Sequence, residues 1–235
     1  MKWTLVTGGS KRLGAEICLA LAAQGQSILV HYRNSKHDAE SVVTKCRQMG
    51  VDAEMIQGDF SSMESTASFI QDCQKQYPDI KNLINNVGNY LVKSSAQTTA
   101  QEWCELFQTN LNTPFALCQA FLPSLQASKG SIINIGVTGI NNIRADIKRS
   151  AYSATKMGLL MLTKSLAKEL APAHVRVNMV SPGYLGNAVD LPEAVLPMQR
   201  PASMAEVVRV IIFLLNEQNG YLTGQNIEVG GGIGL

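Results

Sequence analysis

The sequence predicts an α/β fold, in which a doubly wound parallel sheet of seven strands carries helices on both faces. Short apolar runs alternate with longer segments of helical periodicity along the whole chain, which is typical of repeated strand–helix–strand units. Glycine, proline or asparagine follows several of the apolar runs, where a strand would turn into the next helix. The 235 residues contain no repeat or linker, so we predict a single domain over 1–235.

The expected strands are short and consist mostly of Ile, Leu and Val. In chain order they lie at residues 5–6, 28–30, 55–56, 83–84, 132–135, 175–177 and 227–229. Between them, apolar side chains recur every three or four residues, as on the buried face of a helix. The predicted helices cover about 12–25, 36–49, 62–77, 99–126, 151–171 and 203–217. The stretch 182–202 lacks such a period and contains four prolines, so we expect an irregular substrate loop there.

Composition excludes several classes of protein. Apolar residues make up 46% of the chain and charged residues 16%, which is too apolar for a disordered protein. The 20 basic and 18 acidic residues give a net charge of +2, so we expect no nucleic-acid partner. No run of 18 apolar residues is present and the first glycine turn leaves no room for a signal peptide, so we expect no membrane span and a cytoplasmic protein. Five scattered cysteines and three spread-out histidines predict reduced thiols and no metal site.

A glycine-rich turn follows the first expected strand. The segment Thr7–Gly14 opens the first helix, and its glycines allow main-chain N–H groups to approach a pyrophosphate closely. A dinucleotide is expected at the first such turn of an alternating α/β chain, and a turn without a ligand is the alternative. The candidate cofactor-binding residues of this turn are Gly8, Ser10, Lys11, Arg12, Leu13 and Gly14.

The residues after the second strand indicate which dinucleotide binds. An Asp or Glu near this point would accept a hydrogen bond from the ribose 2′-hydroxyl of NAD(H) and repel a 2′-phosphate. No acid precedes Asp38 here, whereas Arg33 and Lys11 bring positive charge to this end of the sheet. We therefore expect NADP(H) as the cofactor, with a solvated basic surface as the alternative.

Tyr152 and Lys156 form the most chemically informative pair. They lie four residues apart at the start of an expected helix, so both side chains leave the same face, at the sheet edge that carries the glycine turn. A phenol has a reference pKa of about 10, and a nearby ammonium favours its ionised form. Tyr152 can therefore serve as a proton donor near neutral pH. The segment Asn85–Gly88 brings a glycine and short polar side chains to the same edge.

Jointly these stretches resemble the short-chain dehydrogenase/reductase family over the whole chain, and within it the 3-oxoacyl-acyl-carrier-protein reductases and the pteridine reductases. The resemblance rests on Thr7–Gly14, Asp59, Asn85–Gly88, Asn110, Tyr152–Lys156, Pro182-Gly183 and residues 221–225. It implies a seven-stranded Rossmann sheet, a catalytic Tyr152, a Lys156 that grips the nicotinamide ribose, and an Asn110 that holds a water in a proton relay. It also implies that Asp59 meets the adenine. The further cofactor-binding residues that it implies are Tyr32, Asn34, Phe60, Asn86, Gly88, Pro182, Gly183 and Leu185.

The serine that this family places beside its tyrosine is missing. It stands three residues after the strand asparagine and thirteen before the tyrosine, and these two counts lead here to Val137 and Gly139 respectively. The disagreement implies that the loop before Tyr152 is two residues longer than the common pattern. We hypothesise that the hydroxyl of Thr138, which lies between the two positions, replaces the serine as the catalytic oxyanion partner; a turn threonine is the alternative.

The leading functional hypothesis is an NADPH-dependent reductase that transfers hydride from nicotinamide C4 to a carbonyl or C=N substrate while Tyr152 supplies the proton. The alternatives are a nucleotide-binding regulatory protein with weak or lost catalysis, and a Rossmann methyltransferase. The substrate would be a small carbonyl or pterin-like molecule, and Arg12, where the common pattern has glycine, could contact phosphates or an anionic substrate. The apolar helices over 99–126 and 151–171 resemble the family's dimerising helices, so we expect a homodimer or homotetramer.

Overall fold

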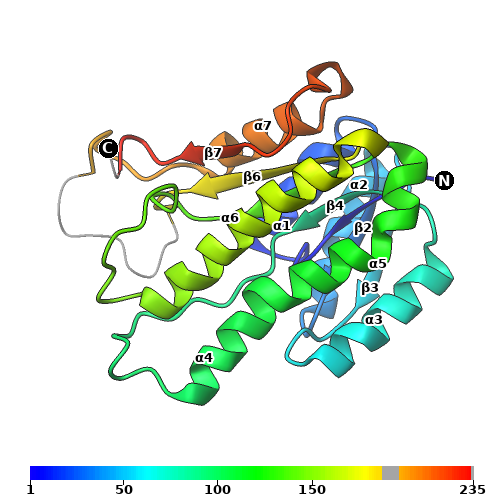
Figure 1. The fold of residues 1–235 in the computed structure, drawn as a ribbon. Coiled ribbons are helices and arrows are strands. Elements are labelled where there is room, and N and C mark those ends of the chain that lie inside the picture. The colour runs from blue at the N-terminus through cyan, green and yellow to red at the C-terminus, as the bar shows by residue number, and fades with distance from the viewer. Residues whose placement is uncertain (187–195, 234–235) are drawn as a thin grey trace.

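Seven strands form one parallel sheet in the computed structural model, which describes residues 1–186 and 196–233 (Figure 1). The spatial order is β3-β2-β1-β4-β5-β6-β7, and all neighbouring strands run parallel. The order reverses between β1 and β4, so the predicted doubly wound α/β sheet is confirmed. The strands are β1 (Trp3–Val6), β2 (Ser27–Tyr32), β3 (Ala53–Gln57), β4 (Ile80–Asn85), β5 (Ser131–Ile135), β6 (Arg176–Pro182) and β7 (Asn226–Val229).

Helices cover both faces of the sheet, as predicted (Figure 1). One face packs against α1 (Arg12–Ala22), α2 (Lys36–Gln48) and α7 (Met204–Leu215), and the other against α3 (Met63–Gln76), α5 (Thr113–Ser128) and α6 (Ser150–Leu170). Strand β2 shows why its apolar run is continuous: Ile28 and Val30 join the core under α1, whereas Leu29 joins the core under α5. Alternate residues of a strand face opposite sides, so a strand buried on both faces needs apolar side chains throughout.

The helix predicted over 99–126 consists of three parts. Helix α4 (Ala100–Phe107) leads into a π-helical turn at Gln108–Asn112, and α5 follows directly. The prediction of one uninterrupted α-helix is therefore wrong at 108–112. Pro114 has no N–H to donate to the carbonyl of Asn110 one turn back, which disfavours the regular α-helical pattern at this point. The wider turn accompanies an inward Asn110 side chain that is completely buried.

Strand β6 extends further than its apolar run predicts. Asn178 and Ser181 interrupt the run, yet both side chains are buried. The amide of Asn178 donates to the carbonyl of Leu222 (2.9 Å), and the hydroxyl of Ser181 donates to Asn226 Oδ1 (2.6 Å). Satisfied hydrogen bonds make these polar residues compatible with a buried strand.

Other expectations concern the loop 182–202, membrane spans and cysteines. Within that loop, 187–195 lie outside the described residues, and its ends meet where Leu185 bridges to Ala202. Across 1–186 and 196–233, none of the helices has the length and apolar character needed to cross a membrane. Four of the five cysteines are buried, and Cys104 is exposed.

Candidate active site

Two loops meet at the carboxyl edge of the sheet, one after β1 and one after β4, where the strand order reverses. The hydroxyl of Thr7 donates to the carbonyl of Ile84 (3.1 Å). It accepts hydrogen bonds from the main-chain N–H groups of Asn86 (2.9 Å) and Val87 (3.1 Å). The side-chain amide of Asn86 donates in turn to the carbonyls of Thr7 (2.9 Å) and Gly8 (3.3 Å). These bonds hold together the two sides of the crevice at which α/β sheets of this kind bind ligands.

The turn after β1 is packed so closely that it requires glycine. Gly8 adopts a φ of +61°, and a Cβ on Gly14 would lie 2.0 Å from the carbonyl oxygen of Gly8. Helix α1 begins after Lys11, which makes no side-chain cap, and its first turn has no acidic residue. Its first N–H groups therefore suit an anion better than those of α3 and α7, which capping boxes occupy. Arg12 is exposed beside this turn and has a φ of +49°.

His31, at the end of β2, holds the glycine turn in place. Its Nδ1 accepts a hydrogen bond from the N–H of Gly8 (2.9 Å), so the ring proton lies on Nε2, which donates to the carbonyl of Gly58 (3.2 Å). The ring stacks on Phe60 with centroids 4.3 Å apart. Burial lowers the pKa of His31 to about 4, so the ring is neutral at neutral pH. In the sequence, only the position of a histidine inside a buried strand indicates this role, and no motif identifies it.

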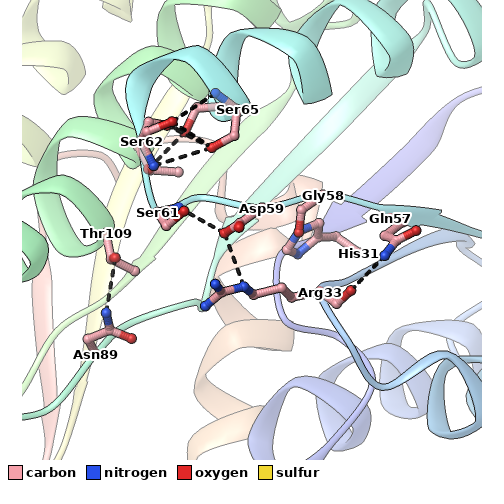
Figure 2. A network of polar contacts seen from close by, with 12 residues as sticks. His31, Arg33, Gln57, Gly58, Asp59, Ser61, Ser62, Ser65, Asn89 and Thr109 are labelled. Atoms are coloured by element: carbon pink, nitrogen blue, oxygen red, sulfur yellow. Dashed lines mark hydrogen bonds and ion pairs between the residues drawn. The ribbon is translucent and has the colours of Figure 1, made fainter.

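The two cations on which the prediction of NADP(H) rests, Lys11 and Arg33, each form an ion pair with a carboxylate. Figure 2 shows Arg33 beside Asp59: Nε lies 3.1 Å from Oδ1, which also accepts the N–H of Ser61. Lys11 Nζ lies 3.0 Å from Asp38. Both pairs are exposed, and such pairs are worth only about 0–1 kcal/mol. A cavity of about 540 Å³, here called the Arg33 cavity, brings together these predicted residues: Gly8, Ser10, Tyr32, Arg33, Asn34, Asp59 and Phe60.

Tyr152 and Lys156 lie together in a second cavity of about 300 Å³, here called the Tyr152 cavity. Lys156 Nζ lies 5.8 Å from the centroid of the Tyr152 ring and donates to the carbonyl of Ile135 (2.8 Å). Only 4% of Lys156 is exposed, and burial lowers its pKa to about 8. The other predicted residues that line this cavity are Leu13, Asn86, Gly88, Thr138, Pro182, Gly183 and Leu185. Lys11, Arg12, Gly14 and Asn110 line neither cavity.

Hydrogen bonds from the Asn110 side chain stabilise the segments that form the wall of the Tyr152 cavity. Its Oδ1 accepts the N–H of Asn89 (2.7 Å), and its amide donates to the carbonyl of Asn89 (2.9 Å) and to Thr155 Oγ1 (3.1 Å). These bonds join the loop after β4 to α6. The π-helical turn thus supplies a side chain that positions the helix on which Tyr152 lies.

The expected oxyanion partner has a different neighbour in the structure. Thr138 lies in the wall of the Tyr152 cavity, but its hydroxyl donates to the carbonyl of Ser181 on β6 (3.1 Å). Its side chain also fills the space beside Gly230, where a Cβ would lie 2.6 Å from Thr138 Cγ2. Val137, at the position counted from the strand asparagine, also lines this cavity and packs against the apolar cluster that contains Leu159 and Met179.

Several residues of the cavity wall carried no signal in the sequence. The ring of Tyr90 meets that of Tyr152 edge-on, with centroids 4.7 Å apart. Arg149 Nη1 lies 3.5 Å from the hydroxyl of Tyr90. Tyr184 and Ile233 complete this wall. All four lie in irregular segments, where neither periodicity nor a motif identifies them.

Comparison with known proteins agrees with this geometry. The family model of the short chain dehydrogenases matches residues 2–193. The 3-oxoacyl-acyl-carrier-protein reductase FabG of Staphylococcus epidermidis is 33% identical over 242 residues, covering 99% of this chain and 98% of that protein. An acetoacetyl-CoA reductase of Acinetobacter sp. is 28% identical, covering 99% and 97% of the two chains.

A solved structure shares the whole fold. The acetoin dehydrogenase YohF from Salmonella typhimurium superposes with a TM-score of 0.89 at 28% identity, covering 98% of this chain and 95% of that one. The family model spans most of the chain, and the relatives span almost all of it. The chain therefore belongs to the short-chain dehydrogenase family of oxidoreductases.

Proposed function

We propose that this oxidoreductase is an NADPH-dependent reductase of a carbonyl or C=N group in a small, carbonyl-bearing or pterin-like substrate. The observation that carries the proposal is the placement of Tyr152 and Lys156 in one cavity at the reversal of strand order, together with Asn86, Gly88 and Pro182. A proton donor and a buried cation thus lie at the crevice in which this type of sheet binds dinucleotides.

When bound, the nicotinamide cofactor supplies a hydride from its C4 atom to the substrate carbon. Tyr152 donates the phenolic proton to the substrate oxygen or nitrogen. The ammonium of Lys156, 5.8 Å from the ring, stabilises the phenolate that forms as the proton leaves. Lys156 also grips the nicotinamide ribose. Asn110 holds a water of the proton relay and keeps α6 in position through Thr155.

The residues present fit a phosphorylated dinucleotide. The uncapped start of α1 and the close-packed glycine turn accommodate the pyrophosphate, with Ser10, Lys11 and Arg12 beside it. In the Arg33 cavity, Asp59 would meet the adenine and Arg33 would pair with the 2′-phosphate; both residues line this cavity. The ion pair between these two side chains is exposed, so a phosphate dianion can replace the carboxylate at little cost.

One observation favours a second candidate, a nucleotide-binding regulatory protein with weak catalysis. Val137, which carries no hydroxyl, lines the Tyr152 cavity at the position where the count from the strand asparagine places the family's serine. NADPH binding without NADPH oxidation, against a panel of keto-acyl, quinone, sugar and dihydropteridine substrates, would favour this candidate. The methyltransferase alternative is wrong, because the chain belongs to a family of oxidoreductases.

The proposal includes self-association and a cytoplasmic location. Apolar side chains of α4, α5 and α6 are exposed in the single chain, and they suit burial in a homodimer or homotetramer. They are Trp103, Phe115 and Met161. A cytoplasmic location agrees with the four buried, unpaired thiols of Cys18, Cys46, Cys73 and Cys118.

The first prediction concerns the choice of cofactor. NADPH should bind about tenfold or more tightly than NADH, because Arg33 makes a charge-assisted contact with the 2′-phosphate. Fluorescence titration of both cofactors measures the two Kd values. Arg33→Ala should remove most of the difference, whereas Arg47→Ala, which removes a cation from the far end of α2, should keep it. Equal Kd values in the wild type would contradict the assignment.

The second prediction concerns the proton donor. Tyr152→Phe should lower kcat by about 10² or more, because it deletes the phenolic proton. The Kd for NADPH should stay close to that of the wild type. Tyr221→Phe is the matched control, because Tyr221 is fully exposed and should be dispensable for turnover. Near-normal turnover by Tyr152→Phe would assign proton donation to another group.

The third prediction concerns the buried ammonium and the free energy of unfolding. The pKa of Lys156 is about 8 in the folded protein and an ordinary 10.5 in the unfolded chain. Between these values the unfolded chain binds more protons, so the folded state gains stability as the pH rises. From pH 7 to pH 9.5 the wild type should gain about 2 kcal/mol relative to Lys156→Met.

Urea denaturation of the cofactor-free protein at the two pH values measures this gain. Lys168→Met, on an exposed position of the same helix, should follow the wild type. If Lys156→Met instead shows the same pH dependence as the wild type, Lys156 keeps its proton up to pH 9.5 in the folded protein, and burial does not lower its pKa.

The fourth prediction concerns Thr138 as the oxyanion partner. In that role its hydroxyl must exchange the carbonyl of Ser181 for the substrate oxygen. Thr138→Val should then lower kcat by about 10²–10³, while Thr138→Ser should retain most of the activity. Urea denaturation of both variants separates this effect from loss of the bond to Ser181. Turnover of Thr138→Val within about threefold of the wild type would exclude Thr138 as the donor.

A further inference from the structure

Arg149 lies in the wall of the Tyr152 cavity and has no part in the proposed proton transfer. It immediately precedes α6 and lies three residues before Tyr152. Both line the cavity, and 31% of the Arg149 side chain is exposed. The substrate therefore meets a permanent positive charge close to the proton donor.

Neighbouring residues hold the guanidinium in one orientation. Arg149 Nε lies 3.3 Å from Asp146 Oδ2. Asp146 is itself held by Ser153, whose hydroxyl donates to Oδ2 (2.8 Å), and by the main-chain N–H groups of Lys148 (3.2 Å) and Arg149 (2.9 Å). At the other end, Nη1 lies 3.5 Å from the hydroxyl of Tyr90, whose ring packs on Tyr152. The guanidinium group is thus held next to Tyr90, in the same cavity wall as Tyr152.

The surroundings of Arg149 are cationic. The Tyr152 cavity adjoins a second cavity, here called the outer cavity, with which it shares Arg149, Tyr152 and Tyr184 as lining residues. Arg144 and Lys148 line the outer cavity, and Lys156 lines the inner one. Of the described residues around both cavities, Asp146 carries the one carboxylate. An anionic substrate group therefore meets a favourable potential here, and a neutral group gains nothing from it.

We propose that Arg149 binds a carboxylate of the substrate, so that the protein reduces small oxo acids in preference to their neutral esters. The inference rests on the proposed reductase function and names its substrate class. A planar guanidinium matches a carboxylate better than it matches a neutral oxygen.

Steady-state kinetics with NADPH can test this proposal on three oxo acids, 2-oxobutanoate, 3-oxobutanoate and 4-oxopentanoate, each paired with its methyl ester. For at least one pair, kcat/KM of the acid should exceed that of the ester by about tenfold or more in the wild type. Arg149→Gln should lower this acid-to-ester ratio by about tenfold or more, chiefly through KM of the acid, because it removes the charge-assisted contact.

The ratio separates carboxylate binding from damage to α6, since a displaced Tyr152 slows acid and ester alike. Arg149→Lys keeps the charge and should give an intermediate ratio. Arg47→Gln makes the same change of net charge on α2 and should keep the wild-type ratio. A wild type that prefers no acid over its ester, or an equal loss for acid and ester in Arg149→Gln, would overturn the proposal while leaving the reductase function intact.

A wild type that reduces neither acids nor esters, nor any other carbonyl compound, would refute the proposed function instead. Calorimetric titration of 3-oxobutanoate into the NADPH-loaded protein then decides the inference. Binding to the wild type that is lost in Arg149→Gln supports it, and absence of binding to the wild type overturns it.

Discussion

The hydroxyl of Thr7 makes the contact on which the rest of the site depends. It donates one hydrogen bond to β4 and accepts two from the loop after β4, which uses its full hydrogen-bonding capacity. The distance between the glycine turn and the Asn86–Gly88 segment is thereby set by main-chain atoms. The side-chain amide of Asn86 donates a hydrogen bond to the carbonyl of Gly8. Gly14 packs against the same carbonyl and has no room for a side chain. Both cavities border this assembly, so their positions follow from it.

Alternating apolar patterns were sufficient to predict the sheet and its covering helices, because each buried strand and each helix face needs its own local pattern. The π-helical turn at 108–112 was beyond such reasoning. Its apolar spacing still resembles that of an α-helix, and what stabilises it is not local: Asn110 bonds to Asn89 and Thr155, which the fold brings from distant parts of the chain. A side chain that joins three elements cannot be recognised from the periodicity of one of them.

The ion-pair partners of the predicted cations were likewise beyond prediction from local sequence patterns. Lys11 and Arg33 were identified as cations near the second strand, and the structure places both at the predicted end of the sheet. Their partners Asp38 and Asp59 lie far along the chain, and only the packing of α2 and β3 beside the glycine turn brings them close. Both ion pairs are exposed and contribute little to the free energy of folding, so a bound anion can displace the carboxylates from Lys11 and Arg33 at little cost. Paired cations and an anion-binding site are therefore compatible.

The loop between β5 and α6 explains why the motifs located the tyrosine and not the groups around it. The two counts that should agree on a serine lead to different residues of this loop, and Val137, the residue reached by one of them, lies in the cavity wall. The same loop contains Asp146, which accepts the main-chain N–H groups of Lys148 and Arg149 just before α6 and orients the Arg149 side chain. Its conformation thus brings the guanidinium of Arg149 into the wall that carries Tyr152. A change in this loop can alter which substrates gain from binding while the motif Tyr152–Lys156 stays the same.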